Sequence, residues 1–299
     1  MSKYSQHIIS NEPNIAMVSF EVSNKCNYAC WYCPPDLHAG TNDWLDLDAS
    51  LRFFRELAST HDRVYVDLIG GEPTLWPRLF DFLAQLPDNV DVEITTNGSR
   101  SIRWWTDAKP HLQKVAISVH AALCDIDHLI AVVDLLRDTV TLHNNVLYDP
   151  KHRAEVERYA LAMRERGIAA EVKPIIPSWE TMLPYTNDEM TWMEQISSWP
   201  NQNLPPIRKP NEISVNGGKF TDMNLAVLAP QKNNFFGWSC WAGRNRFHVH
   251  HSGNILAASC GIASIGNITT GWEIRTAPIT CNKPACWCID DIAIEKFLA

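Results

Sequence analysis

Three cysteines stand close together near the start of the sequence, in the stretch CNYACWYC at 26–33. The spacing CxxxCxxC lets the thiolates of Cys26, Cys30 and Cys33 point at a common centre, as ligation of an iron–sulfur cluster requires. A structural zinc site would need a fourth ligand to close its tetrahedron. Three ligands instead leave one iron of a cluster open for another molecule.

A glycine-rich turn is the second feature that could do chemistry. The sequence GGEP, formed by Gly70, Gly71, Glu72 and Pro73, follows the apolar run 64–69. Two glycines let the backbone approach a ligand closely, and a carboxylate is a suitable partner for an ammonium group. Such turns are common after strands, so the motif gains meaning only together with the cysteine loop.

Five of the nine cysteines lie in the last part of the chain. Four of them would complete a four-cysteine site, in which Cys240 and Cys260 flank a hairpin and Cys281 comes from a later loop. Cys286 and Cys288 compete for the fourth place, because the spacing CxC is tight and leaves one thiol spare. Four thiolates suit a 4Fe–4S cluster or a structural zinc, and geometry alone does not separate the two.

Alternating apolar and amphipathic stretches indicate the elements that hold these residues. Parallel βα units with right-handed crossovers give an open barrel, so we predict an α/β fold with a partial (β/α)6 TIM-like barrel. Chemistry gathers at the C-terminal ends of such strands, where both motifs lie. The predicted strands are 15–22, 64–69, 90–96, 115–120, 139–148 and 170–176, and helices are predicted at 48–60, 77–86, 126–138 and 151–167.

The pattern changes after a further predicted helix at 187–199. The stretch 201–212 is rich in proline and asparagine and predicts a linker. Beyond it, 212–223 and 247–259 each place a glycine turn between short apolar runs, which predicts β-hairpins. The predicted organisation is a barrel at 1–200, a linker at 201–212 and a small hairpin-rich, cysteine-containing auxiliary-cluster domain at 213–299.

The cysteine loop, with Tyr32 just before its last cysteine, and GGEP together resemble the signature of the radical SAM superfamily. The resemblance implies that Cys26, Cys30 and Cys33 hold a 4Fe–4S cluster whose open iron binds S-adenosylmethionine (SAM). It also implies that GGEP contacts the methionyl amino group of SAM. Softer matches at later strand ends would touch the ribose, carboxylate or adenine of SAM: Asn97, Ser118 near His120, and Asn144 or its neighbour Asn145.

The C-terminal cysteines resemble the auxiliary-cluster domain of the twitch or SPASM type, which implies one auxiliary 4Fe–4S cluster. The gap from Gly253 to Cys260 is longer than in that pattern, and five cysteines are too few for two auxiliary clusters. The family resemblance also implies an external one-electron donor of the flavodoxin or ferredoxin type.

The resemblance implies a reaction in which an electron cleaves SAM and the 5′-deoxyadenosyl radical abstracts hydrogen from an unactivated C–H bond. Cys124, just past the fourth predicted strand, is then either a buried inert thiol or a catalytic hydrogen-atom donor. The predicted substrate is a small molecule, amino-acid-like or linked to a nucleobase, since a first strand near residue 15 leaves no room for a leader-binding domain. A ribosomally made peptide is the alternative substrate. A non-catalytic iron–sulfur electron carrier or SAM-binding sensor is the alternative of another class.

Composition limits the partners and the location. The net charge of −8 argues against nucleic acid as the main partner but leaves a local basic groove open. The short run RNR at 244–246 is predicted to be a solvated hairpin turn. His248, His250 and His251 could suggest a metal site, but satisfied or surface histidines are favoured. No stretch has the length of a membrane span or the features of a secretory signal, so we predict a cytoplasmic protein without a membrane partner.

Overall fold

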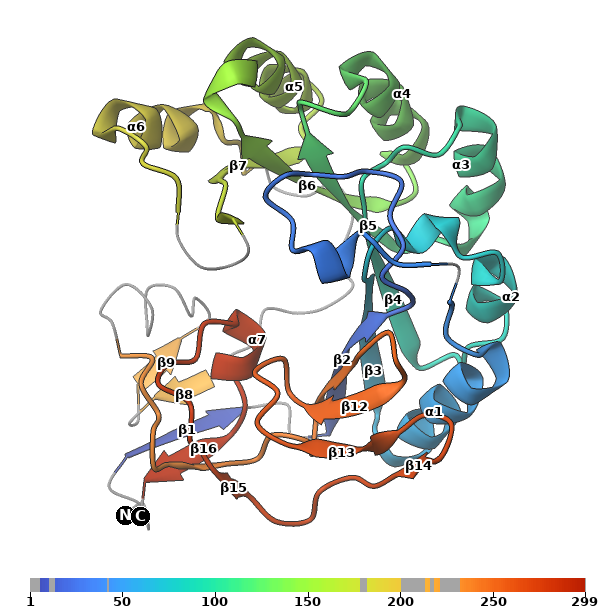
Figure 1. Cartoon of the computed structure of the whole chain (residues 1–299), viewed down its shortest axis with the longest axis vertical. Helices are drawn as coiled ribbons and strands as arrows, with labels where there is room; N and C mark the ends of the chain where they lie inside the picture. Colours follow the sequence, from blue (N-terminus) through green and yellow to red (C-terminus); the bar gives the residue numbers. More distant parts are fainter. Residues whose placement is uncertain are drawn as a thin grey trace.

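The computed structural model describes residues 6–10, 14–41, 43–177, 182–199, 213–215, 218–220 and 232–298. Its strands form two sheets, and helices line the outer side of the larger one (Figure 1). The linker predicted at 201–212 lies outside the described residues. In the described part of the chain, no helix combines the length and the apolar character that a membrane crossing requires.

Six parallel strands form the barrel and pair in chain order, which confirms the predicted α/β fold and partial barrel. The strands are β2 (Ile15–Glu21), β3 (Arg63–Ile69), β4 (Val90–Thr96), β5 (Lys114–His120), β6 (Thr141–Tyr148) and β7 (Ala169–Pro174). The helices are α1 (Leu47–Thr60), α2 (Leu79–Leu83), α3 (Ile102–Ala108), α4 (Ile126–Leu136), α5 (Arg153–Glu165) and α6 (Asn187–Ile196).

Apolar side chains on the helix-facing side of the strands hold the helices in place. Phe20 of β2 packs against Phe54 of α1 and Phe82 of α2, with ring centroids 5.1 and 6.0 Å away. All three rings are fully buried. Each contributes about 1.5–3 kcal/mol relative to an exposed side chain, so this face of the sheet supplies much of the stability of the barrel.

The opposite, inner face of the same sheet is polar. Thr95 of β4 donates its hydroxyl to the Asp67 carboxylate of β3 at 2.9 Å. Lys114 of β5 donates to Glu93 of β4 at 2.6 Å. Side chains alternate between the two faces of a strand. The apolar residues of these strands therefore face the helices, and the polar and charged residues between them face the interior of the barrel. The barrel interior is therefore suited to a polar molecule.

Asp67 gives a testable prediction about stability. Burial, with a smaller contribution from Glu93, raises the pKa of Asp67 from 3.8 to about 7. Because this folded-state pKa lies above the unfolded one, protonated Asp67 stabilises the folded state. This contribution to the free energy of unfolding is fully present below about pH 4 and is lost as pH rises through about 7. Asp67→Asn keeps an acceptor for Thr95 and is expected to exceed the wild type in unfolding free energy by about 1–4 kcal/mol near pH 8, but not near pH 4. Urea unfolding at both pH values measures this, and a pH-independent difference would contradict it.

The C-terminal strands join the barrel on one side and form a second sheet on the other. β11 (Arg246–Val249) pairs in parallel with β2 and forms a hairpin with β12 (Asn254–Ala257), followed by β13 (Ser264–Asn267) and β14 (Gly271–Trp272). The second sheet contains β1 (Gln6–Ser10), β8 (Ile213–Val215), β9 (Gly218–Phe220), β10 (Ser239–Cys240), β15 (Ile279–Thr280) and β16 (Lys296–Leu298).

Both predicted hairpins are confirmed, as β8–β9 and β11–β12. The division into residues 1–200 and 213–299 stays a prediction. Strand pairing among the described residues crosses it three times, because β1 pairs with both β8 and β16, and β2 pairs with β11.

Candidate functional site

The cysteine loop begins where β2 ends, at the C-terminal mouth of the barrel. A bridge between Lys25 and Ala39 closes its base. Within the loop, the N–H of Cys33 donates to the carbonyl of Cys30 at 3.0 Å, which turns the chain between these two thiols. Cys30 is buried, Cys26 and Cys33 are half-buried, and all three are free thiols.

The three thiols lie close enough to influence one another's charge. Burial raises the pKa of Cys30 and of Cys33 to about 11, with a further contribution from Cys26 in both cases. Burial also raises the pKa of Cys26. Cysteine thiols are the ligands that iron–sulfur clusters take, and a bound metal ion lowers their pKa values. The residues present therefore fit the cluster that the loop predicts.

The GGEP turn is tied to the cysteine loop through its backbone. The N–H of Gly71 donates to the carbonyl of Ser23 at 2.9 Å, and the N–H of Glu72 donates to the carbonyl of Lys25 at 2.8 Å. A Cβ atom on Gly71 would lie 2.1 Å from the Lys25 carbonyl oxygen. Glycine is thus required by the close approach of two chain segments, immediately before the first cysteine.

Gly71→Ala is expected to push the segment before Cys26 out of place and to remove about half of the iron bound after reconstitution. The measurement is iron per chain together with the unfolding free energy. Gly167→Ala is the matched control, since no atom lies within 4 Å of its added Cβ. The control should cost about 1 kcal/mol of stability and no iron. Wild-type iron content in Gly71→Ala would contradict the prediction.

The Glu72 carboxylate points into the protein and is 1% exposed. It accepts hydrogen bonds from the Thr74 hydroxyl at 2.6 Å, the Thr96 hydroxyl at 2.7 Å and the N–H of Asn97 at 2.7 Å. These bonds join the turn at Pro73 to the end of β4. The observed role of Glu72 is to position loops, and a direct contact with SAM stays a prediction.

Asn97 is placed against the cysteine loop. Its side-chain amide donates to Oδ1 of Asn27 at 2.9 Å and lies 3.8 Å from Sγ of Cys26. Its own Oδ1 accepts from the N–H of Ser99 at 3.0 Å. The structure therefore brings together the predicted residues of the first three strand ends.

His120, the last residue of β5, reaches the same mouth. Its Nδ1 lies 2.6 Å from the Tyr32 hydroxyl and 3.5 Å from Sγ of Cys30. Burial lowers the pKa of His120 to about 4, so the imidazole is neutral. Cys124 follows one turn later, and its N–H donates to the His120 carbonyl at 3.0 Å. Burial raises the pKa of the Cys124 thiol to about 11, which leaves it protonated near Cys30. Both alternatives for Cys124 stay predictions.

Ser118 and Asn144 are separated by the sheet. Ser118 shares the inner-facing side of β5 with His120 and pairs in register with Asn145 of β6. Asn144 is fully buried on the helix side, where its amide donates to the carbonyl of Ala169 and its Oδ1 accepts from the Tyr159 hydroxyl. Asn144 does not reach the mouth, because strand side chains alternate and only the odd-numbered residues of β6 face inward. Asn145, the other alternative, faces inward on this strand, and its contact with SAM stays a prediction.

The C-terminal cysteines gather in one pocket. Cys240, Cys260, Cys281 and Cys286 line it together with Phe235 and Lys296, among other residues. Cys288 does not line this pocket, and its sulfur lies 4.0 Å from the guanidinium of Arg246. This placement favours Cys286 over Cys288 as the fourth ligand, and the metal site itself stays a prediction.

Two buried charged residues border these four thiols. The ammonium of Lys296 is 2% exposed, donates to the carbonyls of Asp291 and Ile292, and lies 4.6 Å from the ring centre of Phe235. The Asp291 carboxylate accepts from the N–H of Cys260 at 2.9 Å. Burial raises the pKa of Cys286 to about 12, and Lys296 opposes this rise. Four thiols beside a buried ammonium fit a four-cysteine metal centre, since the cation offsets part of the thiolate charge.

Arg246 corrects one expectation from the sequence. The run 244–246 is predicted to be a solvated turn, but Arg246 is 5% exposed and forms an ion pair with Asp291 at 3.2 Å. It also donates to the hydroxyls of Ser19 in β2 and Ser259, both at 2.9 Å. Arg246 thus connects the barrel wall to the pocket of the four cysteines.

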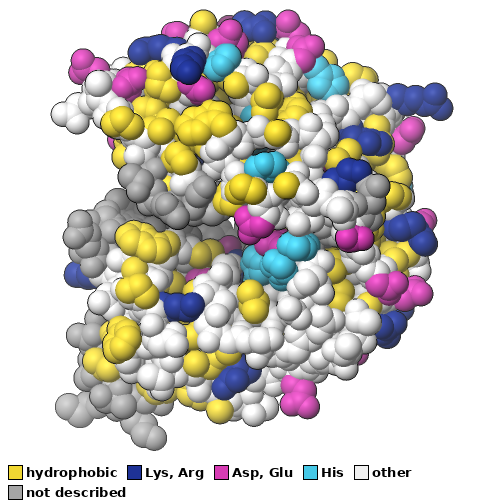
Figure 2. All heavy atoms as spheres, in the orientation of Figure 1, with side chains coloured by type: hydrophobic (Ala, Val, Ile, Leu, Met, Phe, Trp, Pro, Cys, Tyr) yellow, Lys and Arg dark blue, Asp and Glu magenta, His cyan; other side chains and the backbone are white. Residues whose placement is uncertain are grey.

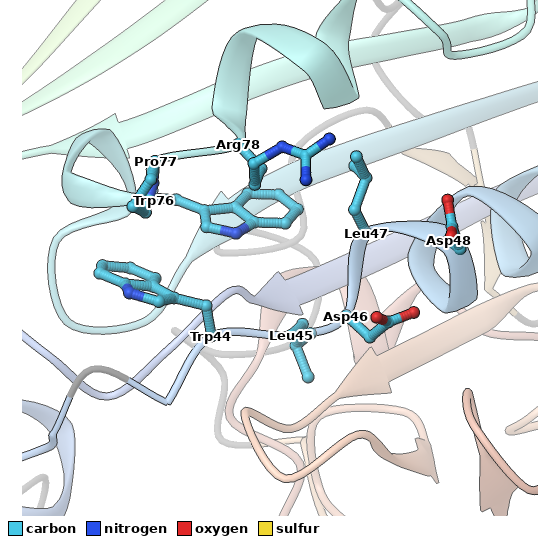
Figure 3. Close-up of a pocket in the computed structure, with 8 residues that line it drawn as sticks. All are labelled: Trp44, Leu45, Asp46, Leu47, Asp48, Trp76, Pro77 and Arg78. Carbon is cyan, nitrogen blue, oxygen red and sulfur yellow. The ribbon is translucent and has the colours of Figure 1, made fainter.

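A separate cleft of about 340 Å³ lies between the loops that lead into α1 and α2. The indoles of Trp44 and Trp76 form two of its walls (Figure 3). Two of its polar groups are already engaged, because Asp46 accepts from the N–H of Ala49 and Arg78 pairs with Asp81. No cysteine lines this cleft, and we assign it no ligand.

Comparison with known sequences supports the interpretation of the cysteine loop. Residues 20–144 match the radical SAM superfamily. A GTP 3′,8-cyclase from Acidothermus cellulolyticus is 29% identical over 225 residues, which are 64% of this chain and 61% of that protein. Another, from Pectobacterium atrosepticum, is 35% identical over 97 residues, 29% of each chain. The chain thus matches less than two thirds of the length of these relatives.

Two solved structures share the fold. One is anSMEcpe with bound AdoMet and a peptide, with a TM-score of 0.52 and 13% identity, covering 86% of this chain and 79% of that one. The other is Streptococcus suis SuiB bound to the precursor peptide SuiA, with a TM-score of 0.56 and 13% identity, covering 87% and 63%.

Proposed function

We propose that the chain is an enzyme that cleaves SAM reductively and activates a C–H bond of a small polar molecule, because residues 20–144 match the radical SAM superfamily. When bound, a 4Fe–4S cluster and SAM supply the one-electron cleavage and the hydrogen abstraction. The main support for the proposal is the contact between the two motifs at the barrel mouth. Backbone N–H groups of GGEP donate hydrogen bonds to carbonyls at the start of the cysteine loop.

The residues of this chain have separate tasks in the proposal. Cys26, Cys30 and Cys33 would hold the cluster. Asn97 lies against Cys26 and positions the loop, while the Tyr32 and His120 rings stack beside it with centroids 5.9 Å apart. Packing of this kind limits the access of water and of unwanted hydrogen donors, which an enzyme that handles reactive species needs. Cys124 is proposed as the hydrogen-atom donor, because its protonated thiol lies near the same loop.

The polar inner face of the barrel supports a small polar substrate. Glu171 and Lys173 of β7 pair at 2.6 Å, and Nε2 of His143 lies 4.0 Å from Glu171. Such fixed charges can orient a polar molecule below the cysteine loop. The names of the sequence relatives contain GTP, which belongs to this class. We extend only the class to this chain: a small, nucleobase-linked or amino-acid-like molecule.

We further propose that Cys240, Cys260, Cys281 and Cys286 hold one auxiliary 4Fe–4S cluster. Its support is the shared pocket and the buried ammonium of Lys296. The count of iron against zinc in the reconstituted protein separates this proposal from a structural zinc.

A peptide is the second candidate substrate. Exposed aromatic side chains beside both sets of cysteines favour it, since Trp31 is 59%, Phe236 65% and Trp287 76% exposed. Apolar surface of this kind is typical of sites that bind another chain.

The test is anaerobic reconstitution followed by addition of SAM and dithionite, which stands in for a flavodoxin- or ferredoxin-type donor. We expect 5′-deoxyadenosine, detected by chromatography, at a rate that rises when a substrate of the right class is added. Nucleotides, amino acids and short peptides are supplied in parallel. If only peptides stimulate the formation of 5′-deoxyadenosine, the substrate is a peptide and not a small molecule. Absence of SAM cleavage in protein with a full iron content would refute the enzymatic proposal.

A further inference from the structure

We propose that Glu21, His250 and His251 form a mononuclear site for a divalent transition metal, separate from both sets of cysteines. One ligand atom from each of the three side chains lies within 4.8 Å of the others. The sequence favours satisfied or surface histidines here, because five thiols lie nearby in the chain, and Glu21 is more than two hundred positions away. The parallel pairing of β11 with β2 brings the three residues together.

The geometry of the group suits one metal ion. A metal at about 2.1 Å from each ligand atom needs ligand atoms roughly 3.0–3.5 Å apart. The ligand atoms lie within 4.8 Å of one another, so binding of a metal would draw them closer by rotation of the two histidine side chains, which lie in the turn after β11. Nε2 of His250 is 3.9 Å from the Glu21 carboxylate, and the two imidazole ring centres are 3.9 Å apart.

A fourth residue holds the carboxylate in place. Nε2 of His248 lies 2.9 Å from Oε1 of Glu21, and the backbone N–H of His251 donates to Oε2 at 3.1 Å. Hydrogen bonds of this kind orient metal ligands in proteins. The Nδ1 atom of His248 is buried and has no hydrogen-bond partner among the described residues. The four side chains thus form an organised polar group and not a set of independent surface residues.

The chemistry of the donors defines the metal. Two imidazoles and one carboxylate are the donor set of non-haem Fe(II) and of Zn(II) or Mn(II) sites with open coordination positions. The site lies at the C-terminal ends of β2 and β11. Histidine and acidic side chains meet near the hollow of the face shown in Figure 2. The coordination positions that the three side chains leave open would be available to an oxygen atom of a molecule bound at the barrel mouth.

Mn(II) is the probe, because it prefers nitrogen and oxygen donors over thiolates. Both cysteine sites are first loaded with clusters and kept oxidised, and free Mn(II) is followed by its six-line EPR signal. We expect about one Mn(II) bound per wild-type chain, displaced by Zn(II). The double variant His250→Ala/His251→Ala is expected to bind at least about 10-fold more weakly, and so is Glu21→Gln.

His111→Ala is the matched control, because His111 is an exposed histidine far from the hairpin. It should bind Mn(II) like the wild type. Equal binding by the double variant, or no binding by the wild type even at millimolar Mn(II), would overturn the proposal. The double variant changes only partly exposed turn residues, so it tests the site even if Glu21→Gln does not fold. SAM cleavage is measured separately, since the metal site does not depend on it.

Discussion

Replacement of Cys26, Cys30 and Cys33 together by alanine is expected to abolish formation of 5′-deoxyadenosine and to lower bound iron from about eight to about four per chain. The loss is complete because these three thiols are the proposed ligands of the cluster that binds SAM. The remaining iron belongs to the pocket of Cys240, Cys260, Cys281 and Cys286. Iron analysis and chromatography after anaerobic reconstitution measure both quantities.

Cys288→Ala is the control for the second site. The Cys288 sulfur lies beside Arg246 and outside the pocket of the four cysteines, so this variant should keep about eight irons. Cys286→Ala, two positions away, should lose the auxiliary cluster. Unchanged iron in the triple variant would show that the cysteine loop holds no cluster. Loss of iron in Cys288→Ala but not in Cys286→Ala would show that Cys288, and not Cys286, is the fourth ligand.

Arg246→Met is expected to lower the free energy of unfolding by about 3–5 kcal/mol and to weaken retention of the auxiliary cluster. The change removes the partner of the Asp291 carboxylate, which is 2% exposed, and an uncompensated buried charge costs this much. It also breaks the hydrogen bond to Ser19, which ties the C-terminal hairpin to β2. Chemical denaturation and the rate of iron release to a chelator measure the two effects.

Arg244→Met is the matched control, because Arg244 is exposed and only stacks over Trp241 at 4.7 Å. It should cost less than about 1 kcal/mol. The double variant Arg246→Met/Asp291→Asn should recover part of the loss, since the unpaired charge is removed as well. A loss of the same size in Arg244→Met, or no recovery in the double variant, would mean that the ion pair is not the cause.

The barrel could be predicted because its signals are local. Each strand from β2 to β7 is an apolar run of the right length, and α1, α4 and α5 show helical spacing. The helix α3 (Ile102–Ala108) was not predicted, since its short stretch IRWWTDA lacks an extended apolar period. The cysteine loop and GGEP were found because motifs at strand ends meet at one mouth.

The parts that sequence reasoning missed depend on contacts between distant segments. The choice between Asn144 and Asn145 stayed open, because both faces of this strand carry polar residues and alternation alone does not say which face is buried. Arg246 looked solvated because its partner Asp291 lies 45 positions later. The grouping of Glu21 with His250 depends on the pairing of β2 with β11, for which neither strand carries a local signal.

The pairing of β1 with β16 has a consequence for the order in which the protein matures. Gln6 lies opposite Leu298 and Ile8 opposite Lys296, and the two ends of the chain lie side by side (Figure 1). During translation β1 is made before the barrel strands and its partner β16 after them, so this sheet and the Lys296 ammonium beside the four cysteines are completed only once the barrel strands have been made. The cysteine loop needs only β2 to β5 around it. The order of synthesis therefore lets the cysteine loop assemble before the pocket of the four cysteines is complete, so that the two proposed clusters can be inserted at different stages.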